Sequence, residues 1–167
     1  MPEEKTNKYA MNLQELVEEK VNEIWKEHID QPFCEIPPLS VKNIPEHGII
    51  FIGINPSLDD KNRERPLNGN SLEIEFYNLK QDGQKNHRYF KKFAEIGEEL
   101  KLPWGHFDLL YIRETQQSKV QELMAYEKGL DFIFKQLMVT KEVIDNLLQI
   151  TEPIIFVVNN TLARRFL

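Results

Sequence analysis

One amide side chain stands in the most informative turn of the sequence. Asn55 lies within Gly53-Ile54-Asn55-Pro56-Ser57, which follows the apolar run Ile49 to Ile52. That β-branched and aromatic run is typical of a strand buried on both faces. Pro56 fixes its own backbone and pushes Asn55 toward an extended conformation, so the turn comes just past the strand's carboxyl end. Because ligands bind at that end of parallel sheets, we expect the chemistry there.

The elements that must position this turn alternate between helix and strand. Helical spacing of apolar residues predicts an amphipathic helix over residues 12–28. The prolines between residues 30 and 46 predict an extended connector. The remaining predictions are strands over 107–112 and 154–158, and helices over 86–100, 118–134, 141–149 and from 161. This alternation predicts an α/β fold, a three-layer α/β/α arrangement around a short parallel sheet with three strands in this chain.

Two stretches depart from the regular alternation. Residues 57–86 are polar with scattered apolar side chains, which predicts a long loop with little regular structure and of the length that often serves as a binding loop or lid. The chain stops within a predicted helix, so we expect a truncated product with a fourth strand missing beyond Leu167. Residues 1–47 are then an amino-terminal helix and proline-rich connector, and 48–167 one α/β domain, incomplete at its carboxyl end.

Composition narrows the class of protein. With 167 residues, 41% of them hydrophobic, the chain can bury one core. No apolar run approaches the roughly 20 residues that cross a bilayer, and the amino terminus lacks a secretion-signal pattern, so we expect a cytoplasmic protein without membrane contact. The net charge of −6 argues against nucleic-acid binding by overall attraction. A local basic segment with Lys85, Arg88 and Lys91 is either a solvated helix face or a phosphate-binding face.

Four segments, in this order, resemble the uracil-DNA glycosylase superfamily, particularly its mismatch-specific uracil/thymine branch. The first motif of that branch has the form Gly-Ile-Asn-Pro-Gly and here runs from Gly53 to Ser57. The other segments are Asn86-His87-Arg88-Tyr89-Phe90, Phe107-Asp108-Leu109-Leu110 with Thr115 beyond it, and the strand Ile154 to Val158. The resemblance spans residues 48–167. Family members carry a second motif after a fourth strand, often with His-Pro-Ser or Asn-Pro-Ser, and this chain has none.

The resemblance implies hydrolysis of the bond between a base and deoxyribose in DNA that contains uracil or a mismatched base. The nucleotide would be rotated out of the duplex. Asn55 would orient a water molecule through its carbonyl oxygen, because an amide cannot take a proton as a carboxylate does. The implied substrate contacts come from Gly53, Ile54, Pro56, Ser57 and, for stacking on the base, Phe76 or Tyr77.

Several assignments stay open on the sequence alone. Asp59 or Asp60 could furnish the carboxylate that Asn55 lacks, or form a solvated turn. Arg113 could contact a base edge or pair with Glu114. Four scattered histidines and a single cysteine show no metal-ligand spacing, so we expect neither a metal nor a cofactor.

Two functions fit these expectations. The first is a glycosylase-like hydrolase for base excision in DNA repair, inactive as this chain because half of the site is absent. The second is a non-catalytic module of the same fold that binds a nucleobase, a nucleotide or a protein. The ordered segments favour the first for ancestry, whereas the net negative charge and the asparagine at position 55 are the grounds for the second.

Overall fold

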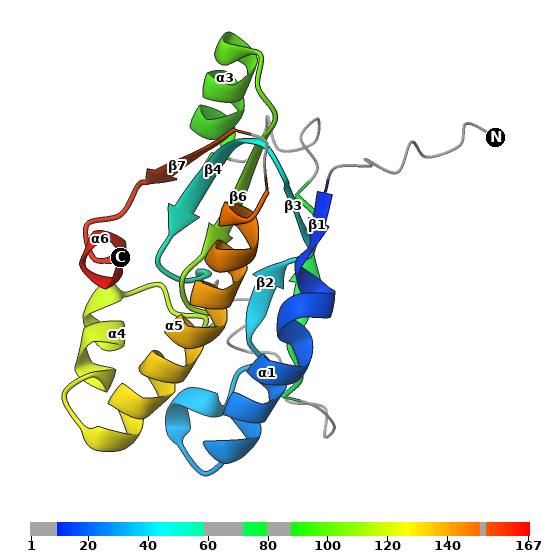
Figure 1. Cartoon of the computed structure of the whole chain (residues 1–167). Coiled ribbons are helices and arrows are strands. Elements are labelled where there is room, and N and C mark those ends of the chain that lie inside the picture. The colour runs from blue at the N-terminus through cyan, green and yellow to red at the C-terminus, as the bar shows by residue number, and fades with distance from the viewer. Residues whose placement is uncertain (1–9, 59–71, 80–87, 151–152) are drawn as a thin grey trace.

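A parallel three-stranded sheet forms the centre of the molecule. The computed structural model describes residues 10–58, 72–79, 88–150 and 153–167. The strand order is β6-β4-β7 (Figure 1). The strands are β4 (Gly48–Gly53), β6 (Trp104–Asp108) and β7 (Ile154–Val158). Gly53 lies opposite Asp108, and Ile52 lies opposite Val158, so the three carboxyl ends meet at one edge of the sheet.

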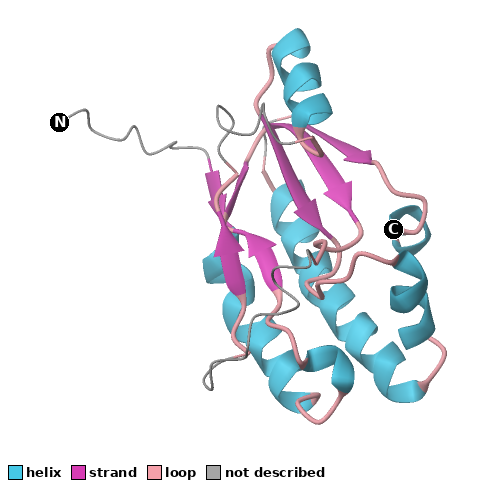
Figure 2. Cartoon of the chain, turned by 180° about the vertical axis from the view of Figure 1, so that it is seen from behind, coloured by secondary structure: helices cyan, strands magenta, loops and turns pink. Residues whose placement is uncertain are grey.

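Helices cover both faces of this sheet, which confirms the predicted α/β architecture. The main helices are α1 (Leu13–Glu27), α3 (Lys91–Leu100) and α5 (Glu127–Leu148). α1 and α5 lie on one face and α3 lies against the other (Figures 1 and 2). Ile50 and Ile52 of β4 pack into the core that contains α1 and α5. Ile49 and Phe51 alternate with them and pack toward α3, where the Phe51 and Phe93 rings stack with centroids 4.1 Å apart.

Shorter elements complete the fold. They are β1 (Ala10–Asn12) antiparallel to β3 (Asn43–Pro45), β2 (Leu39–Val41) parallel to β5 (Glu75–Tyr77), the 3₁₀ turn η1 (Pro32–Cys34), α4 (Gln117–Leu123) and α6 (Ala163–Phe166). β5 corrects the prediction that residues 57–86 contain little regular structure. Its three residues gain backbone partners from β2, in the segment that was predicted as an extended connector. None of the described helices has the length and apolar character of a membrane span.

Several predicted boundaries were wrong. β6 begins at Trp104 and not at Phe107, and the helix predicted over 118–134 is interrupted between α4 and α5. β6 ends at Asp108, four residues before the predicted end, because the apolar residues 109–112 leave the sheet and pack beneath α5. There the side-chain oxygen of Gln136 accepts hydrogen bonds from the backbone of Tyr111 (2.8 Å) and Ile112 (3.0 Å). α5 continues without a break where two helices were predicted, and the Thr140 hydroxyl in its middle donates to the Leu109 carbonyl at 2.7 Å.

Candidate functional site

A cavity of about 390 Å³ opens at the edge of the sheet where β4 and β6 end. Residues 54–57, the turn after β4, form one wall. Tyr77, Tyr89 and Phe90 contribute aromatic rings, and His106 and Asp108 reach the cavity from β6. The volume lies in the range of roughly 300–1,000 Å³ that is usual for small-molecule sites. We call this space the sheet-edge cavity.

The turn after β4 is held in place by the segment that follows β6. The Leu110 amide donates to the Ile54 carbonyl (2.9 Å), and the Glu114 amide donates to the Pro56 carbonyl (3.0 Å). Further on, the Thr115 hydroxyl donates to the Leu58 carbonyl at 2.6 Å. Backbone and side-chain bonds therefore fix the wall of the sheet-edge cavity before any ligand arrives, which lowers the cost of ordering it on binding.

Asn55 is anchored through its amide nitrogen. Nδ2 lies 3.0 Å from the Pro56 carbonyl, 3.2 Å from that of Ile112 and 2.6 Å from that of Glu114. Carbonyl oxygens only accept, so these partners assign the nitrogen to that side of the amide. The hydrogen bonds of Asn55 among the described residues all use Nδ2, so Oδ1 is the acceptor that this cavity residue can offer to a ligand.

His106 and Asp108 alternate along β6 and so lie on one face of the sheet. Their side chains are 2% and 10% exposed, with His106 Nε2 and Asp108 Oδ1 3.6 Å apart. His106 Nδ1 has no hydrogen-bond partner within the described part of the chain. Gly53 makes room for the pair, because a Cβ at that position would lie 2.2 Å from Asp108 Oδ1 and 3.0 Å from His106 Nε2. We call His106 and Asp108 the cavity pair.

Burial shifts the two pKa values of the cavity pair in opposite directions. Removal from water raises the pKa of Asp108 to about 7 and lowers the pKa of His106 to about 3. At neutral pH the imidazole is therefore uncharged, and the carboxyl is close to half protonated. A carboxyl group that titrates near the working pH can both take and return a proton, which is the property that general acid–base catalysis needs.

Two tyrosine hydroxyls complete the polar lining. The Tyr89 hydroxyl lies 3.5 Å from His106 Nε2 and accepts from Asn159 Nδ2 at 3.4 Å. Burial raises the pKa values of Tyr77 and Tyr89, so both hydroxyls stay protonated at neutral pH. The Tyr89 ring is half exposed, which leaves an aromatic surface that a planar ligand can reach.

The sequence-predicted site residues divide into four groups. Ile54, Asn55, Pro56, Ser57 and Tyr77 line the sheet-edge cavity, and Gly53 lies beneath the cavity pair. Phe76 instead packs against the main core, and Arg113 pairs with Glu75 (Nη1 to Oε2, 3.3 Å). Arg88 and Lys91 are exposed on either side of two cavity residues, Tyr89 and Phe90. Asp59, Asp60 and Lys85 lie outside the described residues.

Sequence reasoning gave no role to His106, Asp108 or Tyr89. Asp108 was noted only within a family-like segment, and His106 only as a scattered histidine. The available signal was their spacing: histidine and aspartate two residues apart at the end of a strand point to one face, toward the edge that holds Asn55. Because the strand was predicted to start at Phe107, His106 fell outside it.

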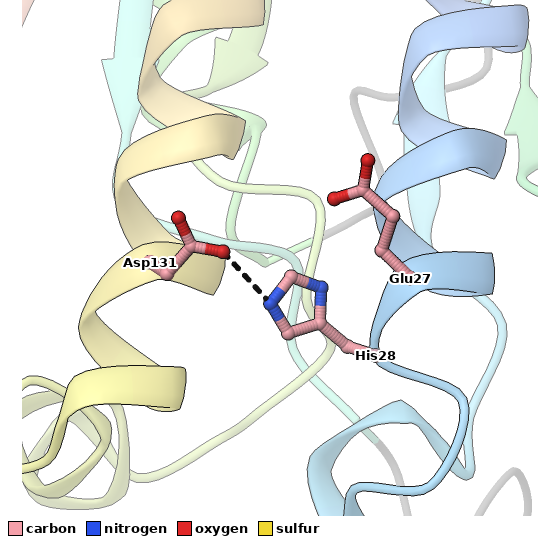
Figure 3. A group of neighbouring side chains, drawn as sticks. All are labelled: Glu27, His28 and Asp131. Carbon is pink, nitrogen blue, oxygen red and sulfur yellow. Dashed lines mark hydrogen bonds and ion pairs between the residues drawn. The ribbon is translucent and has the colours of Figure 1, made fainter.

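A second cluster joins α1 to α5. Glu27, His28 and Asp131 offer ligand atoms that all lie within 4.8 Å of one another (Figure 3). His28 Nδ1 donates to the Ile24 carbonyl at 2.8 Å, and its Nε2 lies 3.1 Å from Asp131 Oδ2. The Lys135 ammonium contacts both carboxylates, at 3.0 Å for Asp131. We therefore assign the cluster as an ion-pair junction between two helices, and we call His28 and Asp131 the junction pair.

The comparisons with known proteins add nothing to this geometry: no protein-family model, no curated protein and no solved structure matches the chain. The residues of the sheet-edge cavity are therefore the basis for assigning a function.

Proposed function

We propose that the chain binds a pyrimidine base of DNA in the sheet-edge cavity and hydrolyses the bond between that base and its deoxyribose. The sequence alone led us to expect an inactive chain, and the carboxyl of Asp108 in the cavity is the reason for proposing activity instead. One observation carries the proposal: Asn55 and Asp108 line the same cavity, whose other walls include three aromatic rings. Aromatic faces stack on flat bases, and an amide can pair with a base edge or orient a water.

Asp108 is the group suited to activate water in this proposal. Its ionised form takes a proton from a water molecule as the water oxygen bonds to the anomeric carbon and the bond from that carbon to the base nitrogen breaks. The base leaves with the bonding electrons and is protonated by solvent or by the Asp108 carboxyl. The negative charge of the ionised form also stabilises the oxocarbenium-like transition state. The assignment gives the proton-accepting role to a carboxylate, so Asn55 needs only to position water or base.

DNA contacts outside the cavity fall to exposed cations. Arg88 and Lys91 flank Tyr89 and Phe90, so a phosphate next to an extruded base can reach them. Contacts with phosphate position the strand without reading its sequence. We therefore expect single-stranded DNA to bind more weakly as salt rises, by roughly 0.7 in the logarithmic slope for each phosphate contact.

The direct test is to detect abasic sites. The chain is incubated in excess with single-stranded DNA that contains uracil and with duplex DNA that contains a uracil–guanine mismatch, and abasic sites are counted by alkaline cleavage. Asp108→Asn should lower the rate about 10²–10⁴-fold, the usual contribution of a general base. Asp30→Asn, an exposed aspartate remote from the cavity in an ion pair with Lys128, is the matched control and should leave the rate unchanged. Absence of abasic sites with the unaltered chain at large excess contradicts hydrolysis.

A second function is favoured by the anchoring of Asn55. Its amide nitrogen is surrounded by backbone carbonyls, an arrangement that stabilises the turn whether or not any reaction occurs. The chain could then bind a nucleobase without cleavage. Titration calorimetry with uracil, deoxyuridine and uracil-containing oligonucleotides separates the two: saturable binding that Tyr89→Ala weakens, with no abasic product, selects the binding module.

A further inference from the structure

α5 carries a row of large apolar side chains on its solvent side. Leu130, Phe134 and Met138 are 51%, 58% and 50% exposed, and their spacing of four residues places them on one face of the helix. The opposite face of α5 packs into the main core through residues such as Phe132 and Ile133. In Figure 1 the outer side of α5 faces the viewer between α4 and α1, with the sheet behind it. We call the three exposed residues the α5 row.

Two residues of opposite charge lie equally far along α5 from Phe134, the central residue of the α5 row. Glu127 precedes Phe134 by seven residues, and Lys141 follows it by seven. Both are exposed, and seven residues are close to two helical turns, so both lie on the same face as Phe134. The face therefore carries Glu127, Leu130, a central aromatic ring, Met138 and Lys141. Two further carboxylates lie on it, each in contact with a lysine of α5: Asp131 with Lys135 (3.0 Å) and Asp145 with Lys141 (2.5 Å). About Phe134 the two apolar residues are symmetric in position, and Glu127 and Lys141 are opposite in charge.

We propose that α5 binds α5 of a second copy of this chain, in antiparallel orientation, with Phe134 on the twofold axis. A twofold axis makes each contact occur twice, once from each copy. Leu130 then meets Met138 of the second copy, and Glu127 meets its Lys141. In a parallel arrangement Glu127 would face Glu127, and the two lysines would face each other. The charge pattern thus selects a second, antiparallel copy as the occupant.

The expected dimer is weak. A crossing of about 20°, the angle of helical bundles, keeps both ends of the α5 row within reach of the facing helix. A single helix pair buries less than the roughly 1,200 Å² at the lower end of stable interfaces, so we expect a dissociation constant on the order of micromolar. Most of the affinity comes from the three apolar side chains, and the Glu127–Lys141 contacts set the orientation.

Sedimentation velocity of the whole chain, from low to high micromolar concentration, tests the proposal. The unaltered chain should shift from monomer to dimer. Phe134→Glu places two carboxylates on the axis and should weaken the dimer by at least about thirtyfold, as expected for a central contact. Leu100→Glu is the matched control, because Leu100 is 55% exposed on α3, away from α5, and this variant should dimerise normally. Thermal unfolding of each variant shows that the monomer remains folded.

A charge exchange tests the orientation. Glu127→Lys and Lys141→Glu should each weaken the dimer about three- to tenfold, and the double variant should recover the original affinity. A chain that stays monomeric at high micromolar concentration overturns the proposal and leaves the α5 row to a different partner. A dimer that Phe134→Glu does not weaken places the contact elsewhere and overturns it as well. Failure of the double exchange to restore affinity overturns the antiparallel arrangement.

Discussion

The cavity pair and the junction pair contain the same two residue types in different surroundings. Asp131 is 47% exposed and contacts the Lys135 ammonium, and both ring nitrogens of His28 have partners. Asp108 is only 10% exposed, and His106 Nδ1 has no partner among the described residues. Contacts with Lys135 and His28 lower the pKa of Asp131, whereas burial raises the pKa of Asp108 to about 7. The junction pair stabilises the fold. Burial of the cavity pair costs folding free energy, and such a cost is typical of residues kept for a functional site.

The largest expected effect is a difference in sign between two equivalent substitutions. Asp108→Asn removes the cost of ionising a buried carboxyl, so we expect it to raise the free energy of unfolding at pH 8 by about 2–4 kcal/mol. Asp131→Asn removes a compensated charge and should lower that free energy. Urea unfolding at pH 8 measures both. A lower free energy of unfolding in Asp108→Asn would contradict this expectation, because it would mean that the ionised carboxylate of Asp108 has stabilising contacts.

Next in size is the effect of filling the space beneath the cavity pair. Gly53→Ala places a Cβ 2.2 Å from Asp108 Oδ1, so the carboxyl or the strand must move. We expect a loss of about 1–3 kcal/mol in the free energy of unfolding, the usual cost of overpacking. Adding Asp108→Asn should not remove this loss, whereas Asp108→Gly should recover much of it because it vacates the space. Urea unfolding of the three variants checks the prediction, and an unchanged stability in Gly53→Ala contradicts it.

The pH dependence of stability should separate the two members of the cavity pair. In His106→Gln only Asp108 of the pair can titrate. Above pH 3.8 the unfolded state releases the carboxyl proton, whereas the folded state keeps it until about pH 7. The free energy of unfolding should therefore fall as pH rises from about 4 to about 7. In Asp108→Asn only His106 of the pair can titrate. Below pH 6.5 the imidazole binds a proton in the unfolded state, whereas in the folded state it stays neutral down to about pH 3. The free energy of unfolding should therefore fall as pH drops from about 6.5 to about 3. Each slope should approach about 1 kcal/mol per pH unit.

In the unaltered chain these slopes oppose each other. Between about pH 4 and 6.5, the unfolded state carries one proton on the imidazole and the folded state carries one on the carboxyl, so the cavity pair contributes almost no pH dependence. Urea unfolding across this range tests all three chains. Parallel slopes in the two variants would contradict the assignment of the protons.

The smallest expected effect lies at the junction pair. Asp131→Asn should lower the free energy of unfolding by at most about 1 kcal/mol, since exposed ion pairs contribute little. Contact with Lys135 lowers the pKa of Asp131, so this contribution is present above pH 3.8 and is lost as pH falls below it. Added salt should reduce the difference from the unaltered chain. A loss that is larger and independent of salt would identify a buried role that the exposure of Asp131 does not support.

The sequence predicted the fold better than it predicted the cavity. The uninterrupted apolar runs of β4 and β7 both form strands, although only β4 is buried along its whole length, and Ile155 and Val157 of β7 are exposed. Pro56 sets the turn that brings Asn55 to the sheet edge. β6 was misplaced because residues 109–112 are as apolar as the strand itself. Nothing local distinguishes a run that pairs in the sheet from one that packs beneath a helix.

The cavity features that the sequence did not predict depend on contacts between segments far apart in the chain. Phe76 and Tyr77 both pack against the main core, but of the two only Tyr77 lines the cavity. The register between β5 and β2 decides this, and a shift of one residue would exchange the two side chains. The burial of His106 likewise comes from rings on α3 and the turn before it, including Phe93 at a centroid distance of 5.8 Å. Neither the strand register nor these ring contacts can be predicted from a single sequence without knowledge of the fold.

The most direct test of the central claim is a carbon-13 NMR titration of the Asp108 carboxyl, assigned by comparison with Asp108→Asn. We expect a midpoint near pH 7 in the unaltered chain, because burial raises the pKa of Asp108 to about 7. A midpoint near the ordinary value of 3.8 would contradict it, because Asp108 would then be a solvated carboxylate like Asp131, with no special fitness for proton transfer.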